Sequence, residues 1–401
     1  MTDAPPGARG PLAGVTVLDL SRLLPGGYCT LLLADLGADV VKVEEPGRGD
    51  YIRWSPPLVE GTSAAHRALN RGKRSITLNL KSPEGGDVLR RLAATADIVV
   101  ESFRPGVLDR LGVGYTALNA LNPRLVYAAI SGYGQDGPYR TLAGHDINYL
   151  GYAGVLWQGG PTGSEPSLAG VQIGDMGGGG MLAAVGILAA LADTRVTGRG
   201  RFVDASMTDG AVSWLSIHGG AHFASRAEAA PDFPRTLSGD LACYRVYRTS
   251  DSRHVTVGAL EPQFWLILCQ TIGLPELIDE QFGPPETQAR VMARLQEVFG
   301  ARTRDEWMTV FDGVEACVGP VNDLDEAFAD PQIRHREMVA VVDGQPVGPG
   351  PAIKLRTPDG KPEAPVQLTG APGLGQHTEE VLATIGIGGD ELADLRARGA
   401  I

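Results

Sequence analysis

The residue types best suited to proton transfer lie in two glycine-flanked segments of the chain. In the first segment His145 and Asp146 follow a glycine, and in the second Asp175 follows a glycine and precedes the glycines at 177–180. Histidine titrates near neutral pH, and glycines let a substrate approach the backbone closely. A histidine and a carboxylate on opposite sides of a carbon could remove a proton from one face and return one to the other. His145 and Asp175 are therefore the first candidates for a catalytic pair.

Each candidate also has a structural interpretation. His145 could be an ordinary structural histidine. Asp175 lies where a helix is expected to begin, so it could be an N-cap, a role worth about 1 kcal/mol. The same position would offer helix N–H groups to a developing oxyanion, with the glycines leaving space for a bulky ligand. Glu261 precedes Pro262 at another expected helix start, where capping is the alternative to holding an imidazole in one tautomer.

Basic residues gather in one stretch although the formal net charge of the chain is -12. They are Arg67, Arg71, Lys73, Arg74 and Lys81, with Arg104 and Arg110 further on. A solvated face is one interpretation. Several of these residues, however, fall in loops at expected strand ends, where open α/β sheets bind ligands. A ligand with several phosphates would suit such a cluster.

The elements that must position these residues alternate in the first half of the chain. Short apolar runs predict strands, and the segments between them predict helices. The expected strands are 15–20, 39–43, 75–80, 97–100 and 125–130, and the expected helices are 28–36, 83–96 and 106–121. This order predicts an α/β fold with a parallel, doubly wound sheet. A dinucleotide site is disfavoured because residues 21–27 lack the GxGxxG turn.

The second half changes character after Arg226. Before it, a small-residue helix is expected at 176–191, a strand at 202–206 and a helix at 208–224. After it, 243–249 and 254–259 predict a hairpin, and helices are expected at 262–272, 286–299, 304–311 and 377–385. The pattern predicts a smaller α+β domain followed by a Pro- and Gly-rich return segment.

Composition excludes several classes of protein. The negative net charge argues against a nucleic-acid or anionic-membrane binder. The N-terminal residues lack the apolar core of a secretory signal, and the longest apolar stretches are expected to be too short to span a bilayer, so a cytoplasmic protein is expected. The 4 cysteines are scattered, without the spacing of a zinc site or disulfide frame. No P-loop, HExxH or GxSxG motif is present, so no metal is expected.

The chain resembles the class III CoA-transferase family along nearly its whole length, and within it most resembles the α-methylacyl-CoA racemase branch. The matching segments are 12–15, 33–43, 72–75, 104–107, 131–135, 143–150, 174–175 and 258–264. The resemblance implies an intertwined, ring-like homodimer. Each subunit would have a Rossmann-like large domain formed by 1–225 and 329–401, with a small domain at 226–328 inserted between them.

The resemblance also implies an acyl-CoA substrate, no cofactor beyond its CoA moiety, and the binding residues. Those expected to hold CoA are Arg71, Leu78, Lys81, Arg104 and Arg110. The acyl group would reach a cleft completed by the partner's small domain. In the racemase branch the histidine and aspartate matching His145 and Asp175 are the acid/base pair that inverts the α carbon of a 2-methyl-branched acyl-CoA through an enolate. Asp146 and Glu261 match further acids of that site.

In the transferase branch the aspartate matching Asp175 is instead a nucleophile that forms an anhydride with the acyl group and then an aspartyl–CoA thioester, from which CoA moves to a carboxylic acid. Transferases usually carry another residue, often tyrosine, at the position of His145, which favours the racemase. Departures from the racemase pattern occur at 237–242, in the longer segment 51–71, and at Glu45, where some relatives have an arginine. A catalytically inactive CoA-binding protein is a third hypothesis, which the intact pair disfavours.

Overall fold

The structure, a computed structural model, describes residues 10–228, 236–361, 366 and 368–401. They divide into two compact units, the first made of residues up to 153 with 170–214 and 331–401, and the second of 154–169 with 215–330. The expected large-domain stretch 1–225 is therefore interrupted once, at 154–169, and ends at 214, because 154–169 and 215–225 group with the second unit. The expected small domain at 226–328 lies within that unit, and the return segment begins at 331 rather than 329.

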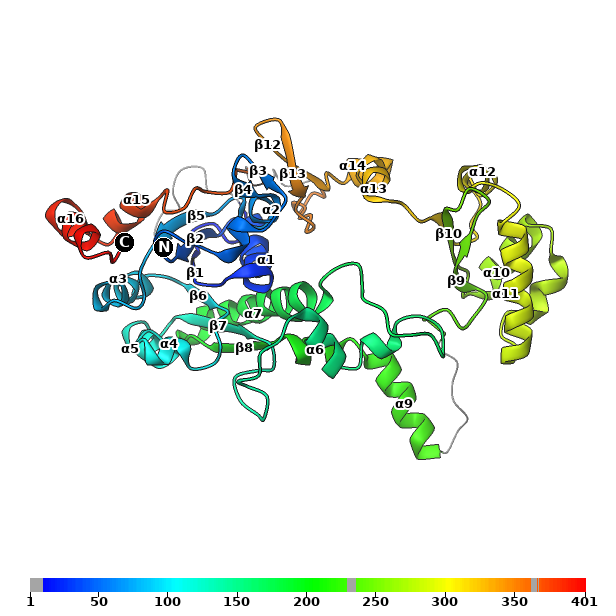
Figure 1. The fold of residues 1–401 in the computed structure, drawn as a ribbon, viewed down its shortest axis with the longest axis horizontal. Coiled ribbons are helices and arrows are strands. Elements are labelled where there is room, and N and C mark those ends of the chain that lie inside the picture. The colour runs from blue at the N-terminus through cyan, green and yellow to red at the C-terminus, as the bar shows by residue number, and fades with distance from the viewer. Residues whose placement is uncertain (1–9, 229–235, 362–365, 367) are drawn as a thin grey trace. The chain divides into compact units, whose positions relative to one another are not determined.

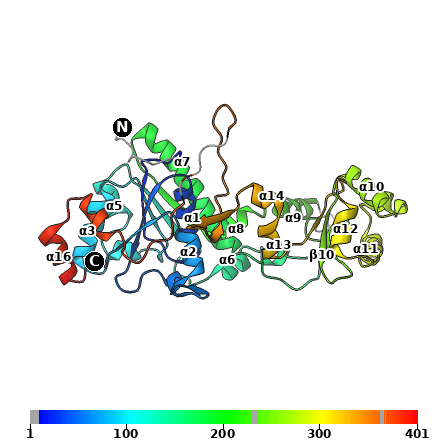
Figure 2. The same ribbon diagram turned by 90° about the horizontal axis from the view of Figure 1, so that it is seen from above.

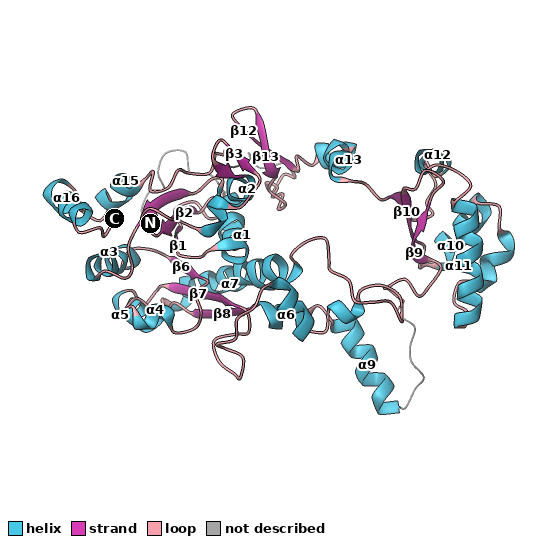
Figure 3. Cartoon of the chain, viewed as in Figure 1, coloured by secondary structure: helices cyan, strands magenta, loops and turns pink. Residues whose placement is uncertain are grey.

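The first unit is built on a parallel sheet of six strands (Figures 1 and 3). The strands are β1 (Thr16–Asp19), β2 (Asp39–Glu44), β5 (Arg74–Thr77), β6 (Ile98–Glu101), β7 (Val126–Ser131) and β8 (Phe202–Ser206). Their order is β5-β2-β1-β6-β7-β8, so the strand order reverses between β1 and β6. This is the Rossmann strand order, with a topological switch point at that reversal. The predicted α/β class is confirmed.

Alternating apolar side chains give the sheet a core on each face. Leu18, Val41 and Val99 belong to one buried cluster, whereas their neighbours Val17, Val40 and Ile98 belong to the other. Such strands, buried on both faces, are typical of parallel sheets.

Helices supply the other half of each core (Figures 1 and 2). The first cluster includes side chains from α3 (Pro83–Ala93), α4 (Val107–Arg110), α5 (Tyr115–Leu121), α15 (Thr378–Ala383) and α16 (Gly389–Ala397). The second includes side chains from α1 (Leu23–Asp35), α6 (Asp146–Tyr152), α7 (Leu182–Thr197) and α8 (Met207–Ser213). The sheet is thus covered on both faces.

The C-terminal segment returns to the edge of this sheet. The His377 N–H donates to the carbonyl of Ser75, and the Asn79 N–H donates to the carbonyl of Ala400. The same unit holds α2 (Ala64–Asn70), α14 (Pro331–His335), the short helix η1 (Tyr51–Trp54), and two small hairpins. The hairpins are β3 (Leu58–Val59) with β4 (Thr62–Ser63), and β12 (Val339–Val342) with β13 (Gln345–Pro349).

The second unit has a core of its own around a three-stranded antiparallel sheet. The strands β9 (Tyr244–Arg248) and β10 (His254–Gly258) form the predicted hairpin, and β11 (Val318–Pro320) extends it. The unit's helices are η2 (Leu156–Gln158), α9 (Ser216–Glu228), α10 (Pro262–Thr271), η4 (Pro275–Glu280), α11 (Pro285–Phe299), α12 (Arg304–Val310) and α13 (Leu324–Ala329). Trp265, Phe299 and Trp307 are buried in this core. The predicted α+β character is confirmed.

Three expected helices have different limits. The expected helix 106–121 is two helices, α4 and α5, because Gly112 takes a φ of 70° between them. The expected helix 208–224 is likewise divided into α8 and α9. The expected helix 176–191 begins earlier, as the π-helix η3 (Ile173–Met181), and continues into α7.

Together η3 and α7 form a helix of 25 residues with a mean hydropathy of 1.5 in its most apolar window. That is long and apolar enough to cross a membrane, so the expectation that no stretch reaches this length is wrong. Half of the window is buried, and Ala183 and Ile187 belong to the core that covers β7. These are the features of a core helix.

Candidate active site

A cavity of about 460 Å³ opens at the carboxyl ends of the central strands in the first unit. Arg22 follows β1, Ser102 and Arg104 follow β6, and Gly132 follows β7, and all four line it. The cavity therefore lies at the switch point between β1 and β6, where ligands of open α/β sheets bind. His145 and Asp175 line the same cavity. The two residues singled out from the sequence are thus brought together, from segments thirty positions apart.

His145 is held at the N-terminal end of α6. It is the residue before the helix, with extended backbone (φ -129°, ψ 174°), and its N–H donates to Asn148 Oδ1 at 3.0 Å. Its carbonyl oxygen accepts from the N–H groups of Asn148 and Tyr149. The side chain is exposed at the cavity. The backbone is fixed while the imidazole can reach a ligand.

Asp175 lies in the first turn of η3, so it is not the N-cap that the sequence suggested; Gln172 holds that position. Its N–H donates to Asp146 Oδ1 at 2.8 Å, which ties η3 to α6 next to His145. Burial and the charge of Asp146 raise the pKa of Asp175 to about 6, opposed by His145. A carboxyl with that pKa can be either acid or base near neutral pH. Segments of π-helix are rare and are frequently found at functional sites.

The glycines after Asp175 serve helix packing. A Cβ on Gly177 would lie 2.0 Å from the Trp214 ring, and one on Gly180 would lie 2.6 Å from the carbonyl oxygen of Pro25 in α1. All four glycines of the run are buried. The expectation that they leave space for a ligand is therefore wrong: they let α1 and α8 approach η3 closely.

Two of the helix N–H groups in the region expected to hold an oxyanion already donate hydrogen bonds within the protein. The N–H of Asp175 donates to Asp146, and the N–H of Met176 donates to the Gln172 carbonyl at 2.9 Å. These two groups are therefore not free donors in this structure.

Arginines give the cavity a positive rim. Arg22 packs between the rings of Tyr51 and Phe103, each 5.2 Å from its guanidinium, and lies 3.8 Å from Glu45. Arg104 and Arg140 also line the cavity, and neither forms an ion pair within the described ranges of the chain. Arginine is well suited to phosphate oxygens. Arg22 and Arg140 were not expected from the sequence, although Arg22 could have been found in the loop after the first strand.

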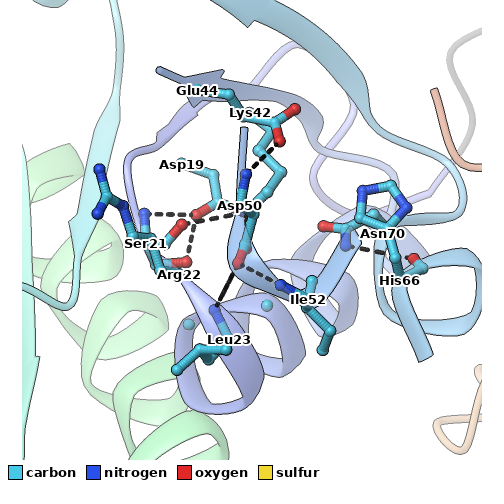
Figure 4. A network of polar contacts seen from close by, with 12 residues as sticks. Asp19, Ser21, Arg22, Leu23, Lys42, Glu44, Asp50, Ile52, His66 and Asn70 are labelled. Atoms are coloured by element: carbon cyan, nitrogen blue, oxygen red, sulfur yellow. Dashed lines mark hydrogen bonds and ion pairs between the residues drawn. The ribbon is translucent and has the colours of Figure 1, made fainter. Parts of the chain in front are cut away.

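A buried network of charges fixes the loop that carries Arg22 (Figure 4). Lys42 Nζ donates to the carbonyl of Ser21 at 3.0 Å and lies 2.9 Å from Asp50. Asp50 in turn accepts from the N–H of Leu23, whose φ of 61° is unusual for a residue with a side chain. The carboxylate therefore stabilises a turn that the backbone alone disfavours.

Asp19 is the centre of the same network. Its carboxylate accepts from the hydroxyls of Ser21 and Thr30 and lies 3.3 Å from Lys73 Nζ. Burial would raise the pKa of Asp19, but Lys42 and Lys73 outweigh it, so the pKa is lowered. Because burial outweighs its carboxylate partner, the pKa of Lys73 is lowered to about 8.

The expected CoA-contacting residues fall into different environments. Arg71 is buried and its guanidinium pairs with both carboxylate oxygens of Asp35, and Leu78 is buried in a core cluster. Neither side chain is available to a ligand in this structure. Of the wider basic cluster, Lys73 is also buried, and Arg74 pairs with Asp39. The expectation of one basic cluster is therefore wrong, because folding neutralises much of it.

The other residues expected to contact CoA are accessible. Lys81 is exposed, pairs with Glu45 at 2.9 Å, and lines a separate hollow of about 460 Å³ with Asn79 and Ser82. Arg110 is exposed near Gly106, where the guanidinium of Arg140 also lies. Arg104 faces the main cavity. These three are available for phosphate binding.

Glu261 belongs to the second unit. It is exposed at the N-cap position of α10, but its side chain makes no capping hydrogen bond. The carboxylate is therefore not used for the structural role that was its alternative. Among the described residues, no group of three or more His, Cys, Asp or Glu side chains could hold a metal ion.

Comparisons with known proteins match this chain almost from end to end. The family model for CoA-transferase family III matches residues 12–378. The human alpha-methylacyl-CoA racemase is 38% identical over 390 residues, which cover 96% of each chain. The human succinyl-CoA:glutarate CoA-transferase is 34% identical over 388 residues, 94% of this chain and 86% of that protein. The crystal structure of a CaiB/BaiF family protein from Brucella suis superposes with a TM-score of 0.79 at 32% identity, covering 94% of this chain and 99% of the other.

Proposed function

We propose that this chain, which belongs to CoA-transferase family III, is a racemase that inverts the α carbon of a 2-methyl-branched acyl-CoA. Membership makes it an enzyme of the CoA-transferase and racemase superfamily. The observation that carries the finer proposal is that His145 and Asp175 line one cavity while the pKa of Asp175 is raised to about 6. The two groups are unlike, and both can exchange a proton near neutral pH.

The reaction needs two proton transfers at one carbon. One group removes the proton α to the thioester carbonyl, and the electron pair moves onto the carbonyl oxygen to give a planar enolate. The other group then delivers a proton to the opposite face, the carbonyl re-forms, and the configuration is inverted. Within the described part of the chain His145 and Asp175 form no ion pair at 4.0 Å or less, which is compatible with a carbon between them.

The proton state of the pair supports both directions. Neutral His145 with protonated Asp175 would serve one epimer, and imidazolium with carboxylate would serve the other. An aspartate with an ordinary pKa would rarely hold a proton near pH 7. The raised pKa of Asp175, to about 6, keeps the protonated state accessible.

CoA-transfer is the second candidate function, favoured by the half-buried carboxyl of Asp175 at the cavity and by transferase relatives at 34% identity. Asp175 would then attack the thioester carbonyl, release CoA thiolate, and form an acyl–aspartyl anhydride. The thiolate would return to the aspartyl carbonyl, release the first acid and leave an aspartyl–CoA thioester. The acceptor carboxylate would attack this thioester and form a second anhydride, and the released thiolate would attack the acceptor's acyl carbonyl to give the new acyl-CoA and free Asp175. His145 has no defined task in that sequence, so the racemase is preferred.

One experiment separates the two. Pure epimers of a 2-methylacyl-CoA are incubated in D₂O, each with and without a free carboxylic acid acceptor. Racemisation predicts deuterium at the α carbon and loss of optical purity without any acceptor. CoA transfer predicts a new acyl-CoA that forms only with the acceptor, and an acyl–Asp175 adduct that hydroxylamine traps. No α exchange with any branched acyl-CoA would overturn the racemase proposal.

For the substrate's CoA moiety we propose contacts with five cationic residues that either line the cavity or are exposed: Arg22, Arg104, Arg110, Arg140 and Lys81. Arg71 and Leu78 are not proposed as side-chain contacts because both are buried. Asp146 is proposed to act through Asp175, whose N–H it accepts. The role of Glu261 and the homodimeric assembly stay predictions from the family resemblance.

A further inference from the structure

Tyr149 is attached to the His145 loop by an unusual hydrogen bond. It lies one helical turn beyond His145 on α6, is 7% exposed, and its hydroxyl donates to the carbonyl oxygen of Gly144. That carbonyl belongs to the peptide that joins Gly144 to His145. The bond therefore fixes the orientation of the backbone on which the imidazole is mounted.

The ring of Tyr149 is held as tightly as its hydroxyl. A Cβ on Gly132 would lie 2.4 Å from the ring and one on Gly144 would lie 2.7 Å from it, so both backbones lie directly against the phenol. Tyr133 packs edge-on at 5.2 Å between ring centroids. The phenol therefore has little freedom to move, and it can transmit its position to Gly144.

His145 is thus fixed from two sides. Asn148 Oδ1 accepts its own N–H at 3.0 Å, and Tyr149 donates to the carbonyl that precedes it. No comparable bond from Tyr149 reaches Asp175 among the described contacts; the Asp175 N–H is held by Asp146. The two members of the pair are therefore positioned by different side chains.

We propose that Tyr149 is a positioning residue for His145 and not for Asp175, an inference that rests on the proposed racemase function. Its hydroxyl sets the peptide plane before His145, and this determines where the imidazole lies relative to the α carbon. Burial and, after it, the charge of Asp175 raise the pKa of Tyr149 to about 12, so the hydroxyl stays a donor throughout the working pH range.

The test uses Tyr149→Phe, which removes the hydroxyl and keeps the ring. In a two-base racemase each epimer is deprotonated by one group, so α-deuterium incorporation is measured for each epimer separately, before inversion. His145→Ala identifies the epimer whose proton faces His145. In Tyr149→Phe the exchange of that epimer should fall about tenfold, since small misplacements of a catalytic group cost that much or more. Exchange of the other epimer should stay within about twofold, and KM should change little.

Tyr247→Phe is the matched control. Tyr247 is also buried, and its hydroxyl also donates to a carbonyl five residues earlier, that of Ala242 at 2.7 Å, but in the core of the second unit. The Tyr247→Phe variant should lose a similar amount of stability in thermal unfolding, and its α-deuterium exchange should show no difference between the epimers. Asn148→Ala removes the acceptor of the His145 N–H and should reproduce the asymmetry of Tyr149→Phe if that variant does not fold.

The outcomes are distinct. An equal fall for both epimers in Tyr149→Phe and Asn148→Ala, or no fall in either variant, overturns the positioning role while the racemase proposal stands. Wild-type protein that exchanges neither epimer overturns the racemase proposal itself.

Discussion

Charged groups meet in two regions of the first unit, and burial has opposite outcomes there. Around Asp19 (Figure 4) the cations Lys42 and Lys73 outweigh burial, and the carboxyl pKa is lowered. At Asp175 burial and the charge of Asp146 raise the pKa to about 6. Asp19 is fully buried and Asp175 only half-buried, yet the pKa is raised at Asp175 and lowered at Asp19, so depth does not explain the difference.

The difference lies in the partners. Lys73 Nζ contacts Asp19, the Thr30 hydroxyl, Asn70 Oδ1 and the Gly27 carbonyl, all within 3.3 Å. Asp175 has no ion pair among the described residues and has another acid beside it. Lys42 and Lys73 lower the pKa of Asp19 and keep its carboxylate ionised throughout the neutral range. An incompletely compensated carboxyl can change state near neutral pH, as proton transfer requires.

Replacing Asp175 should have the largest effect, and only on activity. Asp175→Asn removes one acid/base group, so racemisation should fall about 10³- to 10⁴-fold, about 4 to 5.5 kcal/mol in the barrier. Because the raised pKa means that the ionised carboxylate is disfavoured in the fold, Tm at pH 7.5 should not fall. Racemisation rates and thermal unfolding of the same preparation check both. A lower Tm with the loss of rate would assign Asp175 a structural role.

Replacing Asp19 should do the reverse. Asp19→Ala leaves Lys42 and Lys73 buried without one of their counter-charges, which should lower the free energy of unfolding by about 3–5 kcal/mol. Denaturant unfolding measures this. The control is Asp193→Ala, which breaks the exposed pair with Arg201 and should cost about 1 kcal/mol or less. Equal losses in the two variants would contradict the distinction between the buried network and an ordinary surface pair.

The pH dependence of activity, set at Asp175, should differ from the pH dependence of the stability that the buried network contributes. Below about pH 6, the pKa of Asp175, that carboxyl is protonated and cannot act as a base, so kcat/KM for the epimer that it deprotonates should fall about tenfold per pH unit. Asp19 and the neighbouring buried Glu44, which accepts the Asp50 N–H, have lowered pKa values, that of Glu44 about 2. Their stabilisation is complete above the unfolded pKa and is lost only as pH falls towards the folded value. Activity should therefore change between pH 5 and 7 while their stabilising contribution stays constant.

The sequence predicted the His145–Asp175 pair but not the packing and ion pairs around it. The alternation of strands and helices was predicted because each strand is a short apolar run, and the hairpin 243–259 was predicted from its turn. The burial and ion pairing of Lys73 and Arg71 were not predicted, because a buried ion pair across distant elements leaves no local pattern. The glycines at 177–180 suggested ligand space, whereas neighbours such as Trp214 and Pro25 explain them, and only the fold brings those close.

The smallest effect is expected from Asp146→Asn, which tests how much the charge of Asp146 contributes to the raised pKa of Asp175. The side-chain oxygen of the introduced asparagine could still accept the Asp175 N–H that now donates to Asp146 at 2.8 Å, so the geometry should persist while the like charge disappears. Because Asp146 is the second cause of the raised pKa, after burial, the Asp175 pKa should fall only part of the way back towards 3.8. The acid limb of kcat/KM should therefore move to lower pH with little change in the maximal rate. Asp146→Ala, which also removes the acceptor, should lower the maximal rate as well. An unmoved limb in Asp146→Asn would show that burial alone sets the Asp175 pKa.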